Sequence, residues 1–186
     1  ETLILGEGTY PTTRPVYMTN NVTIVGRGWD RTTVSKTGSR GVFIMAAEDA
    51  HLTGCTVTGG KASDYYNITG SGVRITGRGG KLSWCRMTGN LHGAYYTDGL
   101  GVGMESVNAW VTHCMIDNNV SSSTVDNGGG VNMKNGILEN CLIVNNTARH
   151  GAGVYVAAHD PAGPVGHRKH TFQPFGLHAD SLRIRS

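Results

Sequence analysis

Apolar and polar residues alternate over short stretches along most of the chain, and the stretches end at glycine or asparagine. Such segments predict half-buried β-strands joined by tight turns, because successive side chains of a strand point to opposite faces. No stretch carries the helical periodicity over roughly 10 to 15 residues that a chain of alternating strands and helices needs. The pattern therefore predicts an all-β protein.

The strand pattern repeats about every 30 residues, and each repeat contains one cysteine. Cys55, Cys85, Cys114 and Cys141 are 30, 29 and 27 residues apart. A second signature, Gly-Val followed by alternating apolar positions, comes after each cysteine and starts at Gly72, Gly101, Gly130 and Gly153. A unit of this size cannot bury its own apolar face, so neighbouring units must stack.

Stacked units place equivalent residues in columns, because parallel strands lie about 4.8 Å apart. The columns expected inside are Leu52, Leu82, Val111 and Leu138; Val57, Met87, Ile116 and Ile143; and Val73, Val102, Val131 and Val154. Asn90, Asn119 and Asn146 are expected to form an asparagine ladder at a turn. We predict a right-handed parallel β-helix, a solenoid of about five to six coils, over residues 1–158.

The cysteine column predicts four reduced and buried thiols. Side chains that project in parallel from stacked strands do not readily reach the torsion of about 90° that a disulfide requires. A zinc site is disfavoured, because the sequence has no Cys-x-x-Cys spacing and a linear stack cannot supply a tetrahedron.

Residues 159–186 carry neither the strand alternation nor the ladder residues. This segment is expected to be an irregular C-terminal extension. Three interpretations stay open: a cap over the edge of the last coil, a foreign tail, and a metal site at His167, His170 and His178.

The candidate site lies in the loops between the asparagine ladder and the Gly-Val signature, because insertions in solenoids collect on one face. Candidate catalytic residues are Asp98, Asp126, His150 and Arg149, and candidate substrate-binding residues are Tyr65, Tyr66, Tyr95, Tyr96, Asp64 and His92. Tyrosine faces can hold sugar rings, while carboxylates act as acid and base. The alternative is an aromatic ladder in which the aspartates cap turns.

The cofactor stays open, and one candidate is a divalent cation held by His92 or His150 with Asp98 and Asp126 so that it activates water. The sequence contains no recognised metal motif, so the metal ligands stay undefined. The residues also leave a non-catalytic binding protein open.

The net charge of the chain and its distribution limit the classes of partner that we expect. The net charge is +3, and without residues 159–186 the chain has 12 basic and 11 acidic groups, with no basic cluster. Nucleic acid is therefore excluded as a partner. No apolar stretch approaches the roughly 20 residues of a membrane span. We expect a carbohydrate or another small-molecule substrate.

Residues 1–158 resemble the parallel β-helix proteins of the pectate-lyase-like superfamily. The resemblance begins at Leu3-Ile4-Leu5-Gly6-Glu7-Gly8-Thr9-Tyr10 and continues through the repeats. It implies a bacterial protein that is secreted or at the cell surface and that cleaves or binds polysaccharide, as a lyase or a hydrolase. A metal-dependent hydrolase and a non-catalytic adhesin or structural solenoid are the alternatives.

Two family mechanisms can be compared with the residues. Tyr96-Thr97-Asp98-Gly99 is similar to the Asn-Thr-Asp-Gly motif of polygalacturonases, but no paired aspartates and no Gly-His-Gly segment follow it. Pectate-lyase-like elimination implies a basic residue beside a cation site. Arg74 lies on the outward side of its strand, yet the column expected around it holds no acidic residue, and an ion pair with Lys134 is the simpler role for Glu105.

Overall fold

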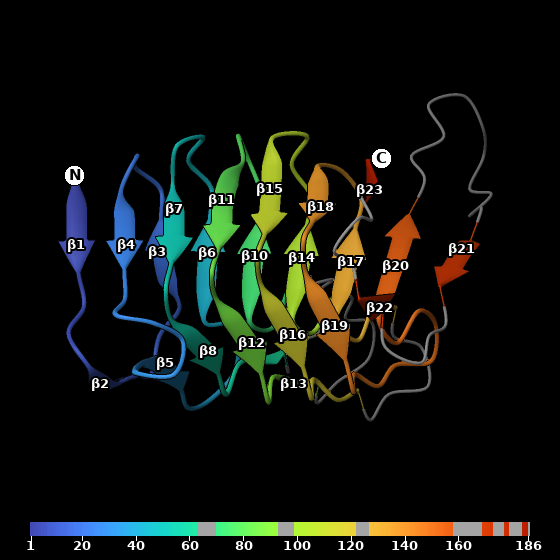
Figure 1. Ribbon diagram of the computed structural model, residues 1–186, viewed down its shortest axis with the longest axis horizontal. Coiled ribbons are helices and arrows are strands. Elements are labelled where there is room, and N and C mark those ends of the chain that lie inside the picture. The colour runs from blue at the N-terminus through green and yellow to red at the C-terminus, as the bar shows by residue number, and fades with distance from the viewer. Residues whose placement is uncertain are drawn as a thin grey trace.

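The protein is an all-β parallel solenoid, seen in a computed structural model that describes residues 1–62, 70–92, 99–121 and 127–157 and the strands 169–172, 177–178 and 184–185. Its strands stack along the long axis from the N-terminal to the C-terminal end (Figure 1). Each coil gives one strand to each of three sheets, and the described residues contain no helix. The all-β parallel solenoid expected from the repeat is confirmed.

The three sheets each hold six parallel strands. The first sheet comprises β1 (Thr2–Ile4), β4 (Thr23–Val25), β7 (His51–Thr53), β11 (Gly80–Ser83), β15 (Ala109–Thr112) and β18 (Ile137–Glu139). The second comprises β2 (Gly8–Thr12), β5 (Thr32–Lys36), β8 (Thr56–Thr58), β12 (Arg86–Thr88), β16 (Met115–Asp117) and β19 (Leu142–Val144). The third comprises β3 (Val16–Met18), β6 (Phe43–Met45), β10 (Val73–Ile75), β14 (Val102–Met104), β17 (Val131–Met133) and β20 (Val154–Ala157). A small sheet pairs β9 (Lys61–Ala62) with β13 (Leu91–His92).

The strand register places the expected apolar columns inside the solenoid. Leu82 pairs with Leu52 and with Val111, and Val102 pairs with Val73 and with Val131. The members of all three predicted columns are buried. One continuous core therefore runs through the stack.

The regular body of the solenoid has about four turns, which is fewer than the five to six coils predicted. These are the turns that carry the cysteines, and two less regular sets of strands, β1–β3 and β4–β6, come before them. The first fifty residues lack the cysteine and asparagine columns, and Leu3 and Ile4 in β1 remain largely exposed.

The asparagine ladder forms at the turn after the second sheet. The Nδ2 amide of Asn90 donates to Oδ1 of Asn119 over 2.9 Å, and Nδ2 of Asn119 donates to Oδ1 of Asn146 over 2.9 Å. The backbone N–H groups of Asn90 and Asn119 donate to the same two oxygens. Each amide thus ties one coil to the next.

All four cysteines are free and buried, as the sequence predicted. The Sγ atoms of Cys55 and Cys85 are 3.9 Å apart. Burial in the core raises the pKa of Cys85 and of Cys114, because the thiolate would lose its hydration there.

Three short strands of the C-terminal extension pair with the last coil. These are β21 (Lys169–Phe172), β22 (Leu177–His178) and β23 (Ile184–Arg185), and they run antiparallel to β20, β19 and β18 respectively. Such pairing is what a cap over the last strand edges would require. The domain division at residue 158, and the choice between cap, foreign tail and metal site, stay predictions.

Candidate functional site

The loops that carry most of the predicted site leave the second sheet and return to the third. Asp64, Tyr65, Tyr66, Tyr95, Tyr96, Asp98 and Asp126 lie outside the described residues. The structure gives the backbone of His92 in β13, and it describes Arg149 and His150. The predicted grouping of these side chains therefore stays a prediction. The described residues at the loop ends show which part of the third sheet adjoins the loops.

Each loop returns to the third sheet through a glycine with a positive φ angle. These glycines are Gly70, Gly99, Gly128 and Gly151, at φ 78°, 69°, 72° and 58°. Glycine suits this left-handed backbone because it has no Cβ. The glycines lie one coil apart, and the N–H of Gly128 donates to the carbonyl of His150 over 2.9 Å. The column fixes where the loops end.

This column bears on two predicted catalytic residues. Asp98 precedes Gly99 in the sequence and His150 precedes Gly151. Gly99 and Gly151 are two coils apart, or about 10 Å at the usual strand spacing. His150 also forms a parallel bridge with Asn127.

The outer side of the third sheet contains a polar group without a partner. Asn132 in β17 points away from the core, yet its side chain is only 1% exposed. Among the described residues, neither its Nδ2 nor its Oδ1 has a hydrogen-bond partner. A Cβ added to Gly99 would lie 2.9 Å from the Cβ of Asn132, so the loop end packs directly against this residue. A buried amide of this kind needs an explanation such as a water or a ligand.

Asn132 belongs to an outward column with Arg74, Gly103 and Tyr155. Because Gly103 has no side chain, the column is interrupted between Arg74 and Asn132, which are two coils apart, or about 10 Å. We call the outer side of the third sheet around Gly103, with Arg74 and Asn132 on either side, the loop face.

Charges on the loop face are paired. Nη2 of Arg74 lies 2.9 Å from Oε2 of Glu105, and Nζ of Lys134 lies 3.5 Å from Oε1 of the same carboxylate. The expected pair between Glu105 and Lys134 is present, and Arg74 joins it. The carboxylate thus holds the Arg74 guanidinium in place, and Arg74 has no unpaired acidic group beside it within the described chain.

No metal centre is evident in the part of the chain that the structure describes, where no group of three or more His, Cys, Asp or Glu side chains could hold an ion. Within the same residues, no helix has the length and apolar character needed to cross a membrane. Both statements concern the described residues alone and leave out loop residues 63–69, 93–98 and 122–126.

Sequence reasoning did not single out Asn132. Its place in an outward column was visible from the repeat, but a polar residue on an outward position is ordinary. Only the packing of Gly99 against it shows that the amide is buried.

Comparisons with protein families, with curated proteins and with solved structures found no match. The parallel solenoid is therefore established by the structure, and membership of the pectate-lyase-like superfamily stays a prediction.

Proposed function

We propose that this protein binds a polysaccharide on the loop face. The observation that carries the proposal is the buried Asn132 amide, which has no hydrogen-bond partner among the described residues. A buried polar group that lacks a partner costs about 1–3 kcal/mol. A ligand that displaced the groups now covering the amide, which is 1% exposed, and supplied the missing partner would recover this cost on binding.

Carbohydrate suits the loop face because the Asn132 amide offers one acceptor and two donors in one plane. Neighbouring hydroxyl groups of a sugar offer the same combination in return. The face also extends along the solenoid axis, and stacked repeats characteristically present extended binding surfaces to long ligands. The tyrosines and aspartates of the adjoining loops would add stacking surfaces and carboxylates.

Cleavage of the polysaccharide is a further part of this proposal. Asp98 and Asp126, with His150 and Arg149, are the residues we assign to acid, base or cation chemistry. Action outside the cell or at the cell surface, expected from the resemblance, belongs to the same proposal.

Binding can be tested by affinity electrophoresis and calorimetry on a panel of neutral and acidic polysaccharides. We expect Asn132→Leu to weaken binding at least tenfold while leaving the thermal midpoint unchanged or raised, because the variant removes an unpaired buried amide. The matched control is Asn108→Leu, at an exposed asparagine whose amide donates to the Arg78 carbonyl. Unchanged binding by Asn132→Leu would refute the proposal for this face.

Catalysis is tested by a separate measurement, the turnover of polysaccharide. Turnover on the same panel, with and without a chelator, should fall in the double variant Asp98→Ala, Asp126→Ala if the loops are catalytic. Retained binding without turnover in the parent protein would instead make it a binding module.

A further inference from the structure

All three tryptophans of the chain lie at the protein surface. Trp29, Trp84 and Trp110 are 37%, 56% and 40% exposed. Indole rings bury large apolar areas when they can, and exposed aromatic groups often mark interaction sites. Trp29 and Trp84 lie at the bend between the first and second sheets, and Trp110 lies in β15 of the first sheet.

The bend is a column of residues with left-handed backbone. Gly54, Trp84, His113 and Asn140 occupy equivalent positions and have φ angles of 70°, 52°, 52° and 52°. Glycine and asparagine tolerate this conformation, whereas other residues pay about 1–2 kcal/mol for it. Two aromatic residues therefore occupy positions that disfavour them, and such strain is characteristic of functional sites.

Trp84 and His113 stack on each other across neighbouring coils. Their ring centroids are 4.4 Å apart and the planes differ by 18°. Nδ1 of His113 also lies 2.8 Å from Oγ1 of Thr112, which fixes the imidazole ring. One face of the Trp84 indole is thus covered by His113, and its other face is directed toward the coil of Gly54, where the column has no side chain.

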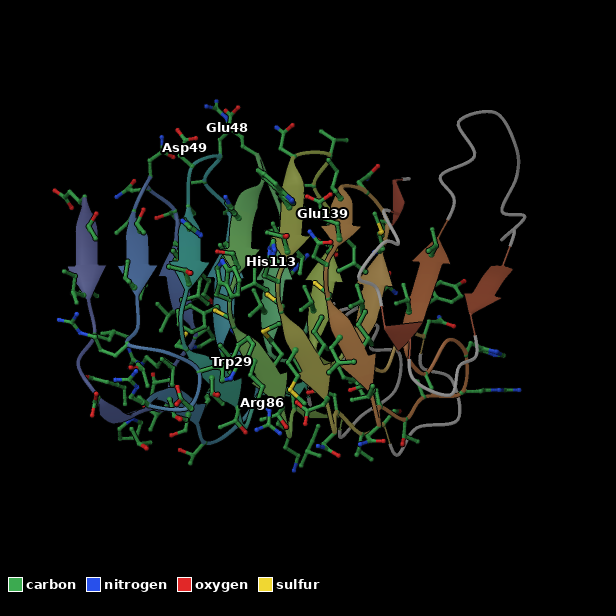
Figure 2. The ribbon with its side chains drawn as sticks, in the orientation of Figure 1. Trp29, Glu48, Asp49, Arg86, His113 and Glu139 are labelled. Carbon is green, nitrogen blue, oxygen red and sulfur yellow. The ribbon has the colours of Figure 1, made fainter. Side chains whose placement is uncertain are left out.

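The coil on the far side of Gly54 carries Trp29. Its carbonyl accepts a hydrogen bond of 2.6 Å from the Thr56 hydroxyl, so the turn of Trp29 is attached to the Gly54 coil. The backbones that bear Trp29 and Trp84 are two coils apart, or about 10 Å. Figure 2 labels His113 at this bend and Trp29 below it, nearer to Arg86 of β12. We call the surface formed by Trp29, Gly54, Trp84 and His113 the tryptophan corner.

Hydroxyl groups lie next to Gly54. Oγ of Ser83 donates to Oγ1 of Thr53 over 3.2 Å and also lies 2.8 Å from Nε2 of His51. Thr53 is partly exposed, and within the described chain its own hydroxyl has no acceptor. Thr53, which precedes Gly54 in the chain, therefore offers a polar donor on the coil next to that of Trp84.

Trp110 extends this surface and is held in place by its neighbours. The Lys81 ammonium lies 4.3 Å from its ring centroid, and its Nε1–H donates to Glu139 over 2.9 Å. The opposite charges of Lys81 and Glu139 offset each other around Trp110. Rings that are already fixed lose little conformational freedom when a ligand binds.

We propose that the tryptophan corner is a second carbohydrate-contact surface, in which a neutral pyranose ring stacks on the uncovered face of Trp84 above Gly54. One face of such a ring presents C–H groups to the indole, and a hydroxyl at its edge accepts from Thr53. A protein partner fits less well, because hydroxyl and charged groups interrupt the aromatic area, whereas stable protein interfaces need about 1,000 Å² of continuous contact. The choice of ligand class rests on the proposed function.

The test measures binding of uncharged polysaccharides and of their short oligosaccharides to the full chain. We expect Trp84→Ala to weaken binding at least tenfold, Thr53→Val to weaken it severalfold, and Trp84→Phe to retain most of it. The matched control is Asn140→Gly, which changes the same column on the other side of the Trp84 and His113 stack. Circular dichroism and the thermal midpoint establish that each variant is folded.

The outcomes separate the two proposals. If Asn132→Leu loses binding and Trp84→Ala stays within twofold of the parent, the tryptophan corner is refuted and the loop face stands. If Trp84→Ala loses binding and Asn132→Leu does not, the corner stands alone. Both proposals fail if the parent binds no polysaccharide. The corner also fails if Trp84→Ala abolishes self-association of the parent in sedimentation while sugar binding is unchanged.

Discussion

Replacing the central amide of the asparagine ladder should destabilise the solenoid strongly. In Asn119→Ala, the backbone N–H and the Nδ2 amide of Asn90 both lose their acceptor, Oδ1 of Asn119, in a buried position. The carbonyl of Met87 and Oδ1 of Asn146 each lose a donor as well. Two buried donors at about 1–3 kcal/mol each give a loss of roughly 2–6 kcal/mol. This is a large share of the roughly 5–15 kcal/mol by which a domain is stable.

Urea unfolding followed by circular dichroism measures this loss as a shift of the midpoint at unchanged slope. The matched control is Asn145→Gly, because Asn145 is exposed, has a φ angle of 55° and lies outside the ladder bonds. The control should change stability by less than about 0.5 kcal/mol. A loss below about 1 kcal/mol in Asn119→Ala would refute the view that the ladder amides carry buried hydrogen bonds that water cannot replace.

Three further predictions concern single groups. Burial lowers the pKa of His51 below its ordinary value of about 6.5, so its stabilising contribution is complete above that pH and is lost as pH falls through the folded pKa. Unfolding measured between pH 7.5 and 5 should show a fall in stability that His51→Gln reduces; an equal fall in both proteins would contradict this. Asp117 is 2% exposed and pairs with Arg86 over 2.6 Å, so Arg86→Leu should cost about 3 kcal/mol, and adding Asp117→Val should recover part of it in urea unfolding. Cys85 and Cys114 should not react with a thiol reagent until the protein is denatured, and rapid labelling of the native protein would show that the core is open.

The columns were predictable because one repeat specifies its neighbours. Leu52 and Leu82 occupy the same place in successive repeats, and parallel stacking without a shift brings them together. The ladder followed from the same alignment, since Asn119 lies in one column with Asn90. The repeat length thus determines the strand register of a solenoid, and a single sequence is enough to recognise the repeat.

The surfaces were less predictable, because exposure depends on what lies over a residue. The repeat alignment puts His113 in one column with Trp84 and Asn140, and the rings of His113 and Trp84 do stack, but the alignment does not indicate that the Trp84 ring is exposed. A signal was present, since Gly54 precedes its cysteine as Trp84 precedes the next one. A glycine at that place indicates left-handed backbone, which turns the following members of the column outward.

The C-terminal strands were not predicted for a different reason. Strands of two to four residues such as β22 and β23 are too short to show alternation, and they pair antiparallel, outside the repeat that specified the other pairings. Their pairing partners are the strands of the last coil, β18, β19 and β20. Coil number was overestimated for a related reason, because the first fifty residues form strands without the columns that define the regular turns.

The constant one-coil separation of paired strands makes the length of this protein an adjustable quantity. Duplication of one repeat would leave every column in register, since each strand would still meet an equivalent strand one repeat away. Each added repeat would lengthen the solenoid by about 4.8 Å, and with it the columns to which the loop face and the tryptophan corner belong. In a lineage of such proteins, the number of repeats would act as a ruler for the length of the chain that the surface can accommodate.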